Sequence, residues 1–174
     1  MEANSRREQV LQTIKQSKAP ISASLLAKTL NVSRQVIVGD VALLRAQGNE
    51  IIATARGYIL PEIRMNNLYL GKIACRHNPE STQLELYTMV DLDAIVINVI
   101  VEHELYGEIT GQLNFNCRED VDAFINQVIS SESKLLSELS MGVHLHTIGC
   151  RDKTHFEQIC HELGKAGFLF EGSN

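Results

Sequence analysis

The sequence predicts an α+β protein made of two small domains, and three observations support this prediction. The chain has 174 residues, enough for one ordinary domain or for two small ones that each bury a core. Its charge is divided, because residues 1–60 contain eight Lys and Arg against four Asp and Glu, whereas residues 61–174 contain eight against seventeen. The first part shows helical spacing followed by a short β-prone segment, while the second mixes helix and strand patterns. We therefore expect a basic domain over residues 1–62 and an acidic domain over residues 67–172.

The composition argues against a membrane protein or a disulfide-stabilised secreted one. No apolar run approaches the ~20 residues that span a bilayer, and the N-terminal segment MEANSRREQ lacks the apolar stretch of a signal peptide. The four cysteines lie far apart with no CxxC pair, which is typical of reduced buried thiols rather than a disulfide framework or a zinc knuckle. We expect a cytoplasmic protein without a membrane partner.

The basic domain is predicted to begin with two helices. Val10, Leu11 and Ile14 share one side of a helix over residues 7–16, and Lys-Ala-Pro then ends it. Ser22 can cap a second helix, which carries leucines at helical spacing, and Asn31 can take the tight turn that follows it.

Ser33 can cap a third helix over residues 34–47, with Gly48 placed to adopt the left-handed conformation after its end. Its buried stripe consists of Ile37, Val41 and Leu44. Its outer face is formed by Arg34, Gln35, Val38 and Ala42.

Two helices joined by a short turn, the second opening with Ser-Arg-Gln, have the geometry of a DNA-reading helix-turn-helix. The hydroxyl of Ser33 and the helix N-terminal amides can hold a phosphate, Arg34 and Gln35 can reach base edges, and Arg45 can neutralise the DNA backbone. Two β-prone segments around Ala-Arg-Gly then predict a hairpin that carries Arg56 toward the DNA. Taken one by one, a serine is usually only a cap and an arginine only a solvated surface group. The predicted DNA-contacting residues are Ser33, Arg34, Gln35, Val38, Arg45 and Arg56.

The segment LLAKTLNVSRQVIVGDVALLRAQGNEIIATARGYIL resembles the winged helix of biotin-repressor-type regulators, with LAxxLxVSRxxI, DxxxLRxxG and GYxL in register. The resemblance covers about a third of the chain. Asp40 is expected to have a structural role. Gly39 departs from the pattern, and a glycine at this position inside the helix is expected to cost about 1 kcal/mol relative to alanine.

The acidic domain alternates predicted strands and helices without the rhythm of a parallel sheet. Helices on one face of a mainly antiparallel sheet are the natural packing. The predicted elements are strands over residues 68–76, 94–101, 108–115, 142–148 and 168–170 and helices over residues 82–90, 119–129 and 153–165.

The segment GVHLHTIGC places two histidines on one face of a strand. Because side chains alternate along a strand, His144 and His146 point the same way and lie about 7 Å apart, which suits two ligands of one metal ion. His77 and Glu85 lie close enough in sequence to be presented together as further ligands. Two alternatives remain open: the histidines are merely hydrogen-bonded or exposed, and Glu85 closes a capping box with Thr82.

The other histidines point less clearly to a site. His103, in VEHELYGE, can line the same cleft or close the turn between two strands. His155 and His161 are six residues apart on a helix and therefore face different ways, so we expect both to be surface groups.

Residues 68–170 resemble the 3H domain, through the blocks ACRHNPES, ELYTMVD, VIVEHELYGEITGQLNF, REDVDAFI and GVHLHTI in order. A winged helix followed by a 3H domain resembles the NiaR (YrxA) family of niacin-responsive transcriptional repressors over nearly the whole chain. That resemblance implies a divalent metal held by His77, Glu85, His144 and His146. It also implies a homodimer that binds a double-stranded DNA operator, senses nicotinic acid as corepressor, and controls genes of NAD biosynthesis and niacin uptake.

Several points stay open at this level. Three imidazoles and a carboxylate suit zinc, nickel, iron(II) or manganese, and affinity alone does not choose among them. The effector can be another pyridine, such as nicotinamide or quinolinate, or the metal itself, and Arg76 is a candidate for contacting an effector carboxylate, although its strand position predicts the opposite face from His77. The rival interpretation is a metal-dependent hydrolase or oxygenase with a fused DNA-binding domain.

Overall fold

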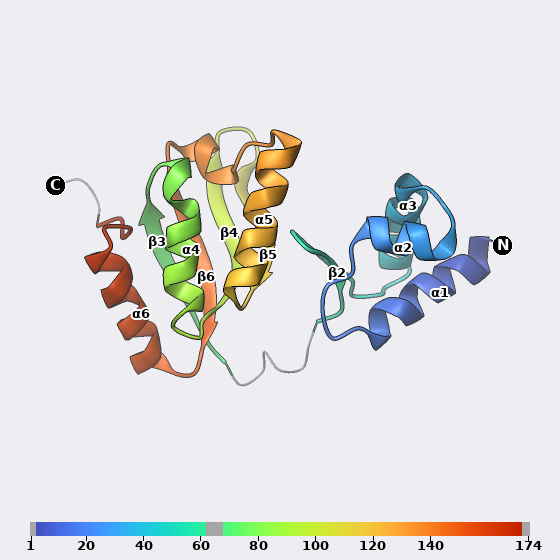
Figure 1. Ribbon diagram of the computed structural model, residues 1–174, viewed down its shortest axis with the longest axis horizontal. Coiled ribbons are helices and arrows are strands. Elements are labelled where there is room, and N and C mark those ends of the chain that lie inside the picture. Colours follow the sequence, from blue (N-terminus) through green and yellow to red (C-terminus); the bar gives the residue numbers. More distant parts are fainter. Residues whose placement is uncertain (1–2, 62–67, 172–174) are drawn as a thin grey trace. The chain divides into compact units, whose positions relative to one another are not determined.

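The computed structural model describes residues 3–61 and 68–171, and the chain divides into two compact units, residues 1–63 and 64–174. Figure 1 shows helices and a hairpin in the first unit and a sheet with helices in the second. Within the described residues, no helix combines the length and the apolar character that crossing a membrane requires. The predicted α+β class is confirmed.

The first unit contains three helices and a two-stranded hairpin. Its elements are α1 (Ala3–Gln16), α2 (Ala23–Leu30), α3 (Arg34–Ala46), β1 (Ile52–Thr54) and β2 (Gly57–Ile59). The first helix begins four residues earlier than the apolar spacing predicts, because its first turn is exposed and carries no core residue that would mark it. The hairpin pairs Ile52 with Ile59, and β2 also bridges back to Ile21, the residue before the cap of α2.

Local side-chain chemistry explains where α2 and α3 begin and end. The Ser22 hydroxyl accepts a hydrogen bond from the Leu25 amide at 3.1 Å, and the Ser33 hydroxyl accepts one from the Val36 amide at 3.3 Å. Between them Asn31 ends α2 with a left-handed φ of 52°. Both predicted caps and the predicted turn are therefore confirmed.

The apolar faces of the three helices meet in one core. Its buried residues are Val10, Ile14, Ala23, Leu26, Ala27, Ile37, Val41, Leu44 and Ile51. At its edge Asp40 of α3 is 3% exposed and accepts two hydrogen bonds from the guanidinium of Arg6, at 2.6 and 3.1 Å. This pair ties α1 to α3, which confirms the structural role expected of Asp40.

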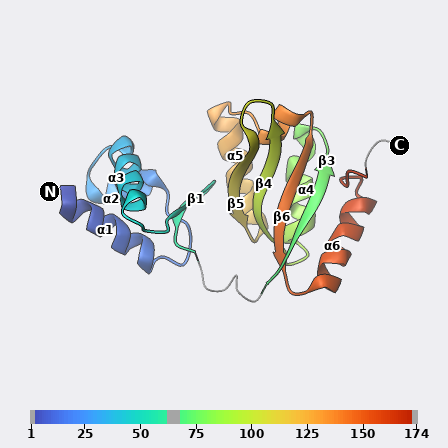
Figure 2. The same ribbon diagram turned by 180° about the vertical axis from the view of Figure 1, so that it is seen from behind.

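The second unit is a four-stranded antiparallel sheet with helices on one face. Its strands have the order β3-β6-β4-β5, so the last strand in sequence is inserted between β3 and β4. Figure 2, seen from behind, shows the other face of the sheet with no helix over it. The elements are β3 (Tyr69–Arg76), η2 (Pro79–Ser81), α4 (Thr82–Val90), β4 (Ile95–His103), β5 (Gly107–Phe115), α5 (Arg118–Ser131), η3 (Leu136–Ser140), β6 (Val143–Cys150) and α6 (Lys153–Lys165).

The pairing of β3 with β6 decides which side chains meet. Cys75 lies directly opposite His144, and Ile73 lies opposite His146. Residues directly opposite each other in an antiparallel pair project from the same face. All four side chains are buried, and they point to the face that the helices cover.

The end of the chain differs from the prediction. Residues 168–170 form a single bridge between Leu169 and Cys75 rather than a strand. Backbone hydrogen bonds join Arg76 to Phe168 and Phe170 to Ala74, so the segment still runs along the edge of β3. The short helix η3, which the sequence analysis does not predict, precedes β6.

Candidate functional site

The turn between α2 and α3 presents the predicted DNA-reading residues at the surface. Ser33, Arg34 and Gln35 are exposed at the N-terminus of α3. Since the Ser33 oxygen already accepts the capping hydrogen bond, a phosphate at this position would accept hydrogen bonds from the Ser33 hydroxyl proton and from neighbouring backbone amides. The geometry of a recognition helix is therefore present.

Three other predicted contacts have structural partners. Val38 is half-buried and packs against the core, so its side chain does not lie fully on the outer face as expected. The Nε of Arg45 donates a hydrogen bond to the carbonyl of Ile51 at 2.7 Å, so this guanidinium also holds the start of the hairpin. Arg56 is half-buried in the turn of the hairpin, where its amide bonds the hydroxyl of Thr54.

The second unit brings three histidines around one buried glutamate. His144 and His146 project from the same face of β6, and His77 follows the end of β3. Glu85 lies on α4, which packs on that face, and has no exposed surface. The carboxylate oxygens of Glu85 are 2.8 Å from Nε2 of His77, 3.1 Å from Nε2 of His144 and 3.4 Å from Nε2 of His146. The four side chains singled out in the sequence analysis thus meet at one point, and Glu85 does not close a capping box.

Backbone carbonyls fix the orientation of all three imidazoles. Nδ1–H of His77 donates to its neighbour Asn78 at 2.7 Å, that of His144 to Gly142 at 2.9 Å, and that of His146 to Asn98 at 2.8 Å. In each ring Nδ1 therefore carries the proton that the carbonyl accepts, and the nitrogen that faces the carboxylate is Nε2. Four electron-pair donors that face one another need a cation between them, either protons or a metal ion. The donor set therefore fits a divalent metal.

The electrostatics of the cluster show the same need for positive charge. Burial alone would raise the pKa of Glu85, but the contacts with His146, His144 and His77 lower it well below its usual value. Burial opposes the charged form of His77, yet its hydrogen bond to Glu85 raises the pKa of this imidazole overall. The carboxylate is thus held ionised in an otherwise apolar interior.

Cys75 is a donor that the sequence analysis missed. Its Sγ, a carboxylate oxygen of Glu85 and a ring nitrogen of His144 all lie within 4.8 Å of one another. Burial, and then the Glu85 charge, raise the pKa of the Cys75 thiol. Alternation along β3 was the available signal, since Cys75 is two residues before His77 and therefore shares its face.

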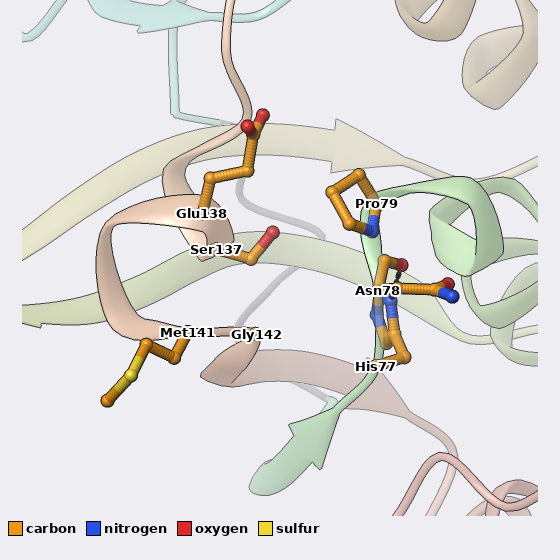
Figure 3. A pocket seen from close by; sticks show the side chains of 7 residues that line it. All are labelled: His77, Asn78, Pro79, Ser137, Glu138, Met141 and Gly142. Carbon is orange, nitrogen blue, oxygen red and sulfur yellow. Dashed lines mark hydrogen bonds between the residues drawn. The ribbon is translucent and has the colours of Figure 1, made fainter.

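A pocket opens beside the cluster at His77. Its volume is about 370 Å³, within the range of small-molecule sites. Figure 3 shows the η3 segment across from the residues that follow β3. The pocket is lined by His77, Asn78, Pro79, Ser137, Glu138, Met141 and Gly142.

Gly142 allows the two walls of this pocket to approach each other. Its φ is +85°, and a Cβ built on it would lie 2.3 Å from the carbonyl oxygen of His77. A glycine is therefore required where the connection from η3 to β6 passes the backbone of His77.

The remaining predicted residues lie away from the cluster. Arg76 is exposed, opposite Val143 on the helix-free face as its strand position predicts, and it does not line the pocket, so an effector bound in the pocket would not contact it. The ring of His103 accepts a hydrogen bond from the Leu105 amide and so closes the β4–β5 turn.

His155 is buried, at 4% exposed, which contradicts the expectation of a surface group. It donates to the carbonyl of Leu92 at 2.6 Å and accepts from the Arg151 amide, because α6 packs that side against the sheet. His161, on the outer side of the same helix, is exposed as expected.

Comparison with known proteins gives matches to both units. Residues 6–59 match an HTH domain family, and residues 71–172 match the 3H domain family. The chain is 41% identical over 168 residues to the transcription repressor NadR of Bacillus subtilis, covering 95% of this chain and 93% of that protein. It is 42% identical over 166 residues to the probable transcription repressor NiaR of Thermotoga maritima, covering 95% and 94%.

Proposed function

The chain belongs to the family of 3H-domain transcription repressors that includes NadR and NiaR, and from this premise we propose that it is a metal-containing repressor whose corepressor is nicotinic acid. The interpretation as a DNA-binding repressor is confirmed over that of a metal-dependent enzyme, because both relatives are named as repressors and the helix-turn-helix is present. The proposed target genes are those of NAD biosynthesis and niacin uptake, and the proposed location of the repressor is the cytoplasm.

The observation that carries the proposal is the convergence of three oriented imidazoles on the Glu85 carboxylate. His77, Glu85, His144 and His146 would hold the metal. Zinc, nickel, iron(II) and manganese all suit this set. A bound divalent ion supplies a Lewis-acidic positive charge that can grip a carboxylate or a pyridine nitrogen.

The pocket beside His77 supports a small aromatic acid as the effector. It adjoins one of the proposed ligands, so a molecule in it lies next to the metal position, and Met141 adds an apolar contact. Nicotinic acid has both a carboxylate and a ring nitrogen, and it is small enough for this volume. Its contacts come from the metal and the pocket walls rather than from Arg76.

The proposed repressor acts as a homodimer joined through its 3H domains. Helix-turn-helix dimers place two recognition helices on half-sites about one helical turn apart, so the spacing between the helices controls affinity. The helix-free face of the sheet carries exposed Leu70 and half-exposed Val143 and Leu145, an apolar surface that suits a second copy. An effector that favours the competent spacing tenfold contributes about 1.4 kcal/mol per site.

The test is a DNA-binding titration at fixed salt, with metal present, on promoter fragments of NAD-synthesis and niacin-transport genes. Binding is expected to tighten with nicotinic acid and to lose this response in His144→Ala. Specific binding that does not change with nicotinic acid but responds to nicotinamide, quinolinate or the metal would refute nicotinic acid as the effector. The assignment as a repressor would then still stand. Absence of specific binding to these promoters would overturn the proposed targets.

A further inference from the structure

We propose that Cys75 supplies a thiolate ligand to the metal, beside the imidazole and carboxylate ligands. The inference rests on the proposed metal centre and extends it from a nitrogen and oxygen site to one that contains sulfur.

The position of Cys75 follows from the register of the sheet. It lies directly opposite His144 in the β3–β6 pair, so both side chains rise from the same face toward Glu85 of α4. The next position along β3, opposite His146, is Ile73, which has no donor. The thiol is therefore at the one place on β3 where a side chain lies under both Glu85 and His144, and it is 0% exposed.

The distances are close to those that a bound ion requires. Sγ, a Glu85 oxygen and a His144 nitrogen lie within 4.8 Å of one another. Zinc binds nitrogen or oxygen at about 2.0–2.1 Å and sulfur at about 2.3 Å, so two ligands at a tetrahedral angle are about 3.6 Å apart. Since no separation in this group exceeds 4.8 Å, a side-chain movement of at most about 1 Å is enough to bring the sulfur into coordination.

Charge balance favours this assignment. Four of the donor side chains, Cys75, Glu85, His144 and His146, are at most 3% exposed. A divalent ion bound by neutral imidazoles and a single carboxylate leaves a net positive charge in this interior, where uncompensated charge is costly. When the metal–sulfur bond forms, the thiol releases its proton to solvent, and the thiolate brings the centre to neutrality.

Cys75 differs in this respect from the other buried cysteine. Cys150 lies at the far end of β6, where its sulfur is 3.7 Å from the carbonyl of Tyr69 and 3.4 Å from that of Asp152. Among the described residues, Cys150 does not belong to the group of donors that meets at Glu85. Cys150→Ser is therefore a matched control for Cys75→Ser.

A sulfur ligand also narrows the choice of metal. Thiolates are soft ligands that favour zinc and similar ions, whereas manganese prefers carboxylate, carbonyl and water oxygens. The set of imidazoles, carboxylate and thiolate thus favours zinc over manganese.

The experiment is cobalt(II) substitution of the full-length protein with absorption spectroscopy. Thiolate coordination gives an intense charge-transfer band in the near ultraviolet, while imidazole and carboxylate coordination alone gives mainly weak visible bands. The wild type and Cys150→Ser are expected to show the ultraviolet band, and Cys75→Ser is expected to lose it while keeping the visible bands. Cobalt bound without an ultraviolet band in the wild type would overturn the thiolate and leave the metal centre standing.

A second measurement covers the case in which Cys75→Ser fails to fold. Zinc X-ray absorption on the wild-type protein is expected to show a sulfur scatterer at about 2.3 Å beside nitrogen and oxygen at about 2.0–2.1 Å. A shell of nitrogen and oxygen alone would overturn the inference. Failure of the wild type to bind either cobalt or zinc would instead overturn the proposed metal centre, and the thiolate with it.

Discussion

Replacing Glu85 by glutamine is expected to weaken zinc binding by about two orders of magnitude. The Glu85 oxygens already lie 2.8 to 3.4 Å from the three imidazole nitrogens, close to the spacing of ligands around one ion. Structural zinc sites bind with about 10–16 kcal/mol, so one ligand in four or five accounts for about 3 kcal/mol. That free energy corresponds to roughly a hundredfold in Kd.

The amide keeps the shape of the side chain but removes its charge. Glutamine at position 85 offers one neutral oxygen where the carboxylate offers two charged ones, and its NH₂ group directs protons toward the imidazoles. The change therefore alters the donor chemistry with little change in packing volume at a site that has no exposed surface.

The assay is competition for zinc with a chromophoric chelator at constant pH and salt. Glu80→Gln, at an exposed position of η2, is the matched control and is expected to keep the wild-type Kd. Far-ultraviolet circular dichroism of the metal-free proteins checks that all three fold alike. Folded Glu85→Gln with the same zinc Kd as the wild type would refute the assignment of Glu85 as a ligand.

Three further predictions concern the two units. Arg34→Glu is expected to lower operator affinity at least about tenfold at fixed salt without altering zinc content, since it reverses a charge facing DNA; unchanged affinity would remove this residue from the interface. Gly39→Ala is expected to stabilise the first unit by about 1 kcal/mol, measured by hydrogen exchange of the α3 amides, because a Cβ at this position meets nothing within 4 Å. The control Gly57→Ala is expected to destabilise the same unit, because its Cβ would lie 2.3 Å from a backbone oxygen. His155→Leu is expected to lower the free energy of unfolding in urea by about 1–3 kcal/mol by stranding a buried carbonyl, and His161→Leu to leave it unchanged; equal values for the two variants would contradict the packing of α6.

Features with local causes could be predicted from the sequence. The bounds of α4 and α6 agree residue for residue with the apolar spacing, and Ser22 and Ser33 cap the helices expected of them. The shared face of His144 and His146 follows from strand alternation alone. Periodicity and capping act within a few residues, so one sequence is enough to detect them.

Features that depend on long-range pairing could not be predicted. The pattern TQLE favours a local capping box, and only the packing of α4 over the sheet sends Glu85 to the histidines instead. Likewise His155 is buried because α6 turns it toward Leu92, 63 positions away. Cys75 reaches the cluster because β6 is inserted beside β3, an order that strand patterns do not encode.

The most direct test of a metal-dependent repressor is operator binding by the same preparation before and after removal of its metal. We expect chelation to weaken operator binding in the presence of nicotinic acid, and restoration of zinc to recover it in the wild type but not in His146→Ala. Operator affinity and response to nicotinic acid that are identical with and without metal would contradict the claim that the histidine cluster couples the effector to DNA.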